Sequence, residues 1–541
     1  MVIDGVTESP GVVKLLRFCS EVFTNVFIFM SSDVFALYYK GDTLLANYRE
    51  IRFEPLTREQ QYELINNAAV ALALQDPLTD DYVDEIEDRV DSVIFSNKIV
   101  PRYPFFVLSV VQTFDACMPS NFAITSYGHC YSAFIMASLS RAGIADDSAL
   151  TAALNFAEQL ALAIFHKEDT EQLEVFDFAT FKEQYDSQYF IEPYIINRLT
   201  NDVFGIITEK GAFQSAYMYY FFLGKVLATD SLLAQRHLLR MCEYSEVDGN
   251  YFTLLFAIHH ARDGDIVDGL VRMLQGELKE VPAATLNSEE TRRFASLIEA
   301  LPQSIEPTRP VPEERARQRR IQDRIEEEFA DQEEDLHLKG ARDYTNVLRV
   351  LKTNRILGQV LRTQHGRLRR EQIEDIVESI TDSSFRLVNL VLKDEREIER
   401  FAKRVKAQRP GANIEDIRHI VQTLSFMWTI ANLEQAVFAV NVPNIKGAVE
   451  AVVDRHRSPA YEIFGYFYLL DSGGGLNSEV RDQLADLFRR HRDLFVRRLL
   501  SIRTQVYVHT HRAKMPMIQS VFAVLDVDYT AHYRAKGIQI R

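Results

Sequence analysis

The sequence predicts a mostly α-helical protein that begins with a short α/β segment. From Leu56 onward, apolar residues recur every three or four positions, which is typical of amphipathic helices. Before that point, two apolar stretches suited to buried parallel strands, Met1–Asp4 and Asn25–Met30, flank a helical stretch at Val12–Phe23. These two patterns together predict a remnant of a parallel sheet followed by a long helical region.

A third strand is expected at Glu50–Phe53, closed by Pro55. Two or three strands do not make a sheet that is covered on both faces, so we expect the chain to begin inside a domain. One edge of this sheet would be open, and an open edge of apolar strands predicts aggregation or dependence on a partner chain.

Composition limits the classes of protein to consider. With 541 residues the chain exceeds a single core, which usually stops growing near about 250–300 residues, so we expect roughly three domains. Its net charge of −16 argues against wrapping nucleic acid globally, although a local basic face stays possible. The four cysteines are scattered and form no CxxC pair, which predicts reduced thiols. No apolar run reaches the roughly 18 residues that a membrane span needs. A cytoplasmic protein without a membrane segment is expected.

Local signals divide the helical region. Thr57 with Gln60 forms a capping-box pattern before a helix, and Tyr217–Leu227 is apolar on all sides, which predicts a helix deep in a core. Prolines cluster at residues 303–312, and a charge-dense run follows whose opposite charges at three- and four-residue spacing predict a solvated helix or linker. Helical patterns resume to about Leu525, with breaks at residues 409–413 and 471–477 and no strict internal repeat.

A nucleotide-binding loop is missing from the sequence. Such a loop needs the pattern G-x-x-x-x-G-K-[ST], because its glycines let backbone amides approach the phosphates. No segment matches this pattern. The chain by itself is therefore not expected to bind a triphosphate tightly.

The opening residues nevertheless resemble a known family. MVIDGVTES, then a helix, then NVFIFMSSD are similar to the Walker B and sensor 1 strands of STAND-type P-loop NTPases. The resemblance implies that Asp4 holds magnesium, that Asp4 and Glu8 are the catalytic acids, and that Ser32 and Asp33 lie near the nucleotide. Thr7 stands where the family often has another acid. Taken without the resemblance, Asp4 is as well explained as an acid in a surface turn.

Further blocks resemble the lid domains of the same family. SNKIVPRYPFFVLSVVQTF and ITSYGHCYSAFIMASL are similar to its helical and winged-helix lids, and the similarity extends in separate blocks to about residue 400. The resemblance implies that Pro101 and Pro104 lie near adenine and that His129 lies near a phosphate. The alternatives are that both prolines only break helices and that His129 is a structural histidine.

The resemblance implies a division of the chain. Residues 1–55 would be a partial P-loop NTPase core, and 56–230 the helical and winged-helix lid. Residues 231–305 would form a helical extension, 306–340 a charged linker, and 341–541 an α-helical sensor or scaffold.

The implied function is the C-terminal part of an ATP-dependent signalling switch in bacterial anti-phage defence. ATP or ADP with magnesium would bind the parent protein, and hydrolysis, if any, would belong to that parent. Expected partners are the missing N-terminal segment with its phosphate loop and effector, or a chain that supplies it. We also expect the protein to bind further copies of itself on activation. A phage protein or nucleic acid is the expected partner of the C-terminal helices.

A basic stretch near the C-terminus leaves an alternative open. Its arginines alternate with apolar residues and could form a face that tracks phosphates: Arg489, Arg490, Arg492, Arg497 and Arg498. They could equally form the solvated face of a terminal helix. In the first case the chain could be a standalone helical module that binds protein or nucleic acid without any nucleotide.

Overall fold

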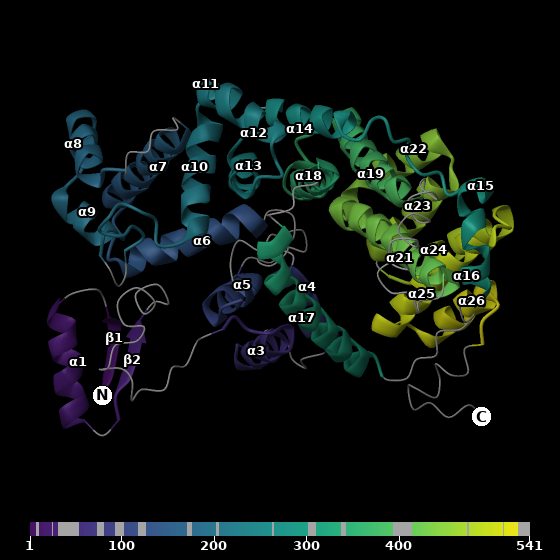
Figure 1. Cartoon of the computed structure of the whole chain (residues 1–541), viewed down its shortest axis with the longest axis horizontal. Helices are drawn as coiled ribbons and strands as arrows, with labels where there is room; N and C mark the ends of the chain where they lie inside the picture. Colours follow the sequence, from purple (N-terminus) through teal and green to yellow (C-terminus); the bar gives the residue numbers. More distant parts are fainter. Residues whose placement is uncertain are drawn as a thin grey trace. The chain divides into compact units, whose positions relative to one another are not determined.

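The computed structural model describes residues 1–6, 10–23, 25–30, 54–72, 80–91, 102–116, 126–169, 176–201, 205–261, 264–300, 310–336, 342–392, 414–472, 475–511 and 513–528. These residues are mostly helical, as the sequence predicts, and they include one two-stranded sheet (Figure 1). The chain separates into two compact units, Met1–Pro55 with Ala133–Tyr219 and Leu56–Ser132 with Tyr220–Arg541.

The first unit opens with two strands joined by a helix. Strand β1 (Val2–Val6) pairs in parallel with β2 (Phe27–Met30), and Val2 lies opposite Phe27. Parallel neighbours need a crossover, which here contains helix α1 (Pro10–Val22), lying alongside the strands in Figure 1. Both predicted strands are thus present, but Asp4 lies within β1 and not at its end. The expected strand at residues 50–53 lies outside the described residues.

Aromatic side chains form the core of the helical part of this unit. Its helices are α6 (Ser126–Arg141, from Ala133 on), α7 (Asp147–Asp169), α8 (Phe178–Gln188) and α9 (Pro193–Leu199). Phe156 of α7 is fully buried, and the rings of Phe178, Phe181 and Tyr185 from α8 meet it edge-on. After α9, an isolated antiparallel bridge joins Ile207 to Phe213.

Helix α7 contains the one candidate membrane span among the described residues. Residues Asp147–Lys167 are long and apolar enough to cross a membrane by length and composition. The core helix of a water-soluble protein meets the same criteria, and 33% of this apolar stretch is buried, including Phe156, Ala157 and Leu160. This helix is therefore weak evidence for a membrane segment.

The second unit begins with three helices that pack together: α3 (Arg58–Ala71), α4 (Asp80–Val90) and α5 (Pro104–Ala116). The predicted capping box at α3 is confirmed. The Gln60 amide donates to Thr57 Oγ1 at 3.2 Å, and the Thr57 amide donates to Gln60 Oε1 at 3.0 Å. Both otherwise free backbone donors are satisfied, which fixes where this helix begins.

A second group of helices continues this unit. It comprises α10 (Ala216–Thr229, from Tyr220 on), α11 (Ser231–Leu233), the π-helical turn η4 (Ala234–Leu238), α12 (Leu239–Glu243), α13 (Asp248–His260), α14 (Asp265–Gly276), α15 (Ser288–Thr291), the 3-10 turn η5 (Arg292–Phe294) and α16 (Ala295–Ala300). In α10 the side chains of Phe221, Phe222 and Leu227 are buried, which confirms the prediction of a core helix.

The charged run forms helix α17 (Val311–Leu336). The prediction of a helix is confirmed, but the prediction that it is solvated is wrong for one of its faces. The side chains of Arg319 and Glu87 of α4 are only 9% and 7% exposed, and they form an ion pair at 3.1 Å. Periodic charges look the same in sequence whether their partners lie on the same helix or on another one, which explains the error.

The C-terminal helices pack around a core of buried side chains. They are α18 (Arg342–Gln364), α19 (Arg370–Leu392), α21 (Ile414–Val440), the turn η6 (Pro443–Ile445), α22 (Lys446–His456), α23 (Pro459–Ser472), α24 (Ser478–Arg490), α25 (Leu494–Thr510) and α26 (Met515–Leu525). Helix α21 packs against α18, α19 and α23. Trp428 of α21 donates its indole N–H to the Leu387 carbonyl of α19 at 2.9 Å. The predicted break at residues 471–477 separates α23 from α24.

Candidate functional site

The residues expected near a nucleotide are only partly described. Asp4 lies in β1, His129 lies in the first turn of α6, and Pro104 is the exposed first residue of α5. Glu8, Ser32, Asp33 and Pro101 lie outside the described residues. Within the described part of the chain, no group of three or more His, Cys, Asp or Glu residues could hold a metal ion. The nucleotide site therefore stays a prediction.

The five arginines of the basic stretch lie on α24, on α25 and between them. Arg489 Nη1 lies 3.5 Å from Asp486 Oδ1, and Arg490 Nε lies 2.7 Å from Asp486 Oδ2. Arg490 also pairs with Glu462 of α23. Arg492 is exposed between the two helices.

The remaining two arginines belong to α25, and the protein holds Arg497 firmly. Arg497 donates to the backbone carbonyls of His491 at 2.8 Å and Phe488 at 2.6 Å, and its guanidinium lies 5.5 Å from the Phe488 ring centre. Burial lowers the pKa of Arg498. These contacts join α24 to α25, so they favour the structural interpretation over a continuous face for phosphates.

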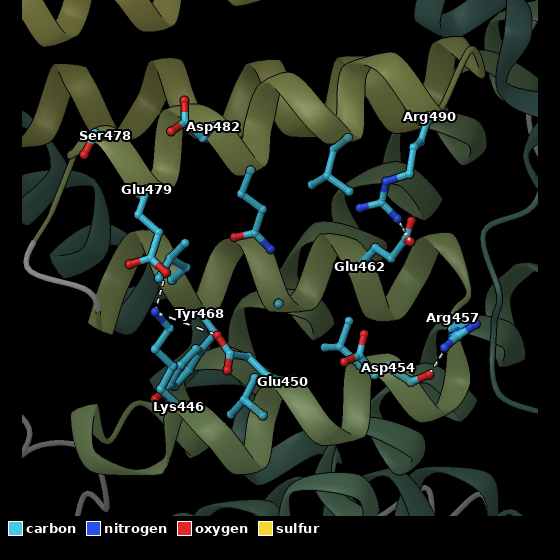
Figure 2. A pocket seen from close by; sticks show the side chains of 16 residues that line it. Lys446, Glu450, Asp454, Arg457, Glu462, Tyr468, Ser478, Glu479, Asp482 and Arg490 are labelled. Carbon is cyan, nitrogen blue, oxygen red and sulfur yellow. Dashed lines mark hydrogen bonds and ion pairs between the residues drawn. The ribbon is translucent and has the colours of Figure 1, made fainter.

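A groove between helices α22, α23 and α24 is the best candidate for a binding site among the described residues. It has a volume of about 920 Å³. Helices α22 and α24 form its two walls, and α23 forms its floor (Figure 2). The floor and lower walls are apolar or lack a side chain: Val449, Val453, Gly465, Leu469 and Leu487.

Local signals position these three helices. Asn477 caps α24 by accepting from the Val480 amide at 3.0 Å, and Pro459 occupies the first position of α23. Tyr468 of α23 is buried and donates its hydroxyl to the Val442 carbonyl at 2.7 Å. A Cβ atom at Gly465 would lie 3.0 Å from Val453 Cγ2, so this glycine allows α23 to lie close to α22.

The upper walls of the groove are strongly charged. Together with Glu462 of α23, they carry five carboxylates and three cations: Glu450, Asp454, Glu462, Glu479 and Asp482 with Lys446, Arg457 and Arg490. The cations are already engaged near the two ends of the groove, as Figure 2 shows. The Glu450 and Asp482 side chains are 62% and 64% exposed; Glu450 lies 3.8 Å from Lys446, and Asp482 pairs with Arg481.

Each end of the groove is closed by an ion pair. At one end Lys446 bridges the walls by pairing with Glu479, and it lies 3.8 Å from Glu450. The hydrogen bond with Glu479 raises the pKa of Lys446, so this ammonium group stays charged. At the other end Arg490 pairs with Glu462. The net charge of the side chains that line the groove is therefore negative.

The sequence shows the carboxylates but not the groove. Glu450 and Asp454 are four residues apart, so they lie on the same face of α22, and this could have been noticed. The groove itself needs three helices whose packing no local pattern gives. Neither histidine nor cysteine is among the described residues that line it, and its charged groups are carboxylates, one ammonium and two guanidinium groups. Comparisons of the chain with models of protein families, with curated proteins and with solved structures found no match.

Proposed function

We propose that this chain is the C-terminal part of a STAND-type NTPase switch in bacterial anti-phage defence. In this proposal the helices from α18 onward recognise the activating signal, and ATP or ADP with magnesium binds the parent protein. A bound nucleotide would supply the energy difference between the resting and the active state. No step of nucleotide chemistry is assigned to the described residues, because Asp4 alone does not make a magnesium site.

The observation that carries the proposal is the placement of helix α17. Near its N-terminus it packs against α25, and further along it packs against α3. Arg315 pairs with Asp84 of α4, and Arg319 pairs with Glu87 at 3.1 Å. Asp323 accepts from the Arg58 amide at the start of α3 at 2.9 Å. One helix thus contacts both the proposed lid helices and the proposed sensor helices, so a change in one group could be transmitted to the other.

The N-terminal strands agree with this proposal. A parallel pair of strands with a helical crossover is the basic unit of P-loop sheets, and Asp4 lies in the first strand. A winged-helix lid would contain a short antiparallel hairpin, and an isolated antiparallel bridge joins Ile207 to Phe213. Both observations support the proposed family at the level of topology.

Within this switch, the groove between α22 and α24 is the proposed recognition site. Its five carboxylates against three cations would repel a phosphate backbone, so it favours a protein segment that carries Lys or Arg over a nucleic acid. At one end of the groove Glu462 pairs with both Arg490 and His491, just before α25 begins. Helix α25 packs against α17, which in turn packs against α3. The effect of a ligand bound in the groove could therefore be transmitted to α3 and α4 through these packed helices.

The second candidate function is a helical interaction module that works without nucleotide. It is favoured by the fact that the groove is built by α22, α23 and α24 alone. Binding there would not require any contribution from the N-terminal strands.

The two candidates are separated by calorimetry with ATP and ADP in the presence of magnesium. The measurement compares this chain with a version extended upstream through a phosphate-binding loop. Binding by the extended version alone is the expected result, because the phosphates need that loop. If neither version binds nucleotide, the switch is wrong and the interaction module is the better account.

A further inference from the structure

The groove between α22, α23 and α24 presents two kinds of surface that a ligand has to match. Its lining carries five carboxylates against three cations above an apolar floor. Figure 2 shows Glu450 and Asp454 on the wall formed by α22 and Asp482 on the wall formed by α24. All three of these side chains belong to exposed residues. A ligand that suits the groove therefore combines positive charges with apolar side chains.

One segment of this chain has that composition. Residues 529–541, with the sequence YTAHYRAKGIQIR, contain the cations Arg534, Lys536 and Arg541 and neither aspartate nor glutamate. Ile538 and Ile540 add large apolar side chains. The charge of this segment is thus opposite to that of the groove, and its isoleucines match the apolar floor.

Helix α26 brings the start of this segment close to the groove. It packs against α24, which forms one wall of the groove, and Arg481 Nη1 of α24 donates to Ser520 Oγ of α26 at 3.5 Å. Residues 529–541 follow directly after Asp528, three residues beyond the end of α26. Thirteen residues span about 40 Å when fully extended, whereas α24 is about 20 Å long and a helix is roughly 10 Å across. The segment is therefore long enough to pass around α24 and run along the groove.

We propose that residues 529–541 occupy the groove of their own chain in the resting state, with Arg534 and Lys536 against the exposed carboxylates of its walls. This inference rests on the recognition role proposed for the groove, and it adds how that site is regulated. A foreign segment that carries Lys or Arg then binds only by displacing the chain's own segment. The resting contact is autoinhibitory, and the foreign segment relieves it.

Charge favours the chain's own segment over that of a second copy. Each chain carries a net charge of −16, so two copies repel each other when they approach. Binding within one chain avoids this repulsion. A tethered segment is also present at an effective concentration on the order of 1 mM, which a second copy does not reach in dilute solution.

The test is fluorescence anisotropy of a labelled synthetic peptide of residues 529–541, added to the full chain at low ionic strength. In the original chain this peptide competes with the tethered segment. If the peptide binds a free groove with a Kd of about 100 µM, a tethered competitor at about 1 mM weakens its apparent affinity about tenfold. The variant with Arg534→Glu and Lys536→Glu loses the competitor, so it should bind the peptide about tenfold more tightly than the original chain does.

Two further variants are the controls. Lys279→Glu with Arg367→Glu makes the same change of charge at two exposed residues outside the groove, so this variant should bind the peptide as the original chain does. Glu450→Gln with Asp454→Asn, added to the variant with the reversed segment, should remove the tenfold gain. Circular dichroism should show unchanged helix content for every variant.

The outcomes separate this inference from the role proposed for the groove. If the original chain and the variant with the reversed segment bind the peptide equally, the inference is overturned and the groove remains a site for foreign basic segments. If neither binds, the inference and the recognition role fail together. Binding that survives Glu450→Gln with Asp454→Asn also overturns the inference, since the peptide then binds elsewhere.

Sedimentation equilibrium tests whether the segment binds its own chain. The original chain and the variant with the reversed segment should have the same mass. A dimer of the original chain that the reversed segment dissociates would place residues 529–541 in the groove of a second copy, which overturns the contact within one chain. Calorimetry with nucleotide tests the switch independently of all these results.

Discussion

The Arg319→Met substitution tests how firmly α17 is docked on α3 and α4. Arg319 is 9% exposed, pairs with Glu87 at 3.1 Å, and holds its guanidinium 3.9 Å from the centre of the Tyr62 ring. Methionine keeps most of the side-chain volume but removes the charge. Glu87, only 7% exposed, would then be a buried carboxylate without its cation.

The expected magnitude depends on pH because burial raises the pKa of Glu87 to about 7, even though Arg319 acts to lower it. Without Arg319 the pKa of Glu87 rises above 7, so the variant keeps a proton that most of the original chain has lost at pH 8. This adds at most about 1.4 kcal/mol, so a total cost of about 2 kcal/mol is expected at pH 8. At pH 5.5 Glu87 holds a proton, and the cost falls to about 1 kcal/mol for the lost contact with the Tyr62 ring.

The sign follows from proton binding. A carboxyl group whose pKa is raised in the folded protein binds protons more readily there than in the unfolded chain. Its contribution to stability is complete below the ordinary pKa of 4.5 and is lost as the pH rises toward about 7. Without Arg319 the pKa rises further, so the variant should lose stability up to a higher pH than the original chain does.

Hydrogen exchange of the α17 amides is the assay, because it reports local opening and not only global unfolding. At pH 8, Arg319→Met should speed exchange by about 30-fold relative to the original chain, and by about fivefold at pH 5.5. Arg317→Met is the matched control, since Arg317 is 47% exposed and pairs with Glu314 of the same helix. An equal effect at both pH values, or none at pH 8, would refute the reasoning.

Three further substitutions test the C-terminal helices. Gly358→Ala would bring a Cβ atom within 2.6 Å of the Ala439 carbonyl oxygen, so it should lower the free energy of unfolding by about 1–3 kcal/mol in urea titrations. Gly447→Ala meets nothing within 4 Å and should be neutral or stabilising. Burial lowers the pKa of His511 to about 4, and its ring stacks on Tyr507 at 4.0 Å. A histidine whose pKa is lowered in the folded protein contributes stability that is lost as the pH falls from 6.5 through 4. The His511→Phe substitution should therefore reduce the drop in melting temperature between pH 7 and pH 5. An unchanged drop would contradict this prediction.

Local patterns predicted the parts of the fold that depend on neighbouring residues. The capping box of Thr57 and Gln60 involves residues three positions apart, and it is present. The burial of α10 followed from a segment that is apolar on every side. In both cases the deciding interactions lie within one helix or depend only on its average composition.

Contacts between distant segments could not be predicted in the same way. Arg319 and Glu87 are 232 positions apart, and nothing in either segment identifies the other as its partner. The groove likewise depends on how α22 and α24 pack on α23. The arginines of α24 and α25 show the same limit, because the partners of Arg497 are backbone carbonyls, which every residue carries.

Trp428 gives the protein an optical property of its own. It is the single tryptophan among 541 residues, so emission excited at the red edge of the protein absorption comes from one indole and is not averaged over several sites. That indole is bonded to α19 through Leu387, and it lies next to Met427 in the chain. Its emission wavelength therefore reports the packing of α19 on α21, and a quencher in solution would report whether the neighbouring surface is open to water.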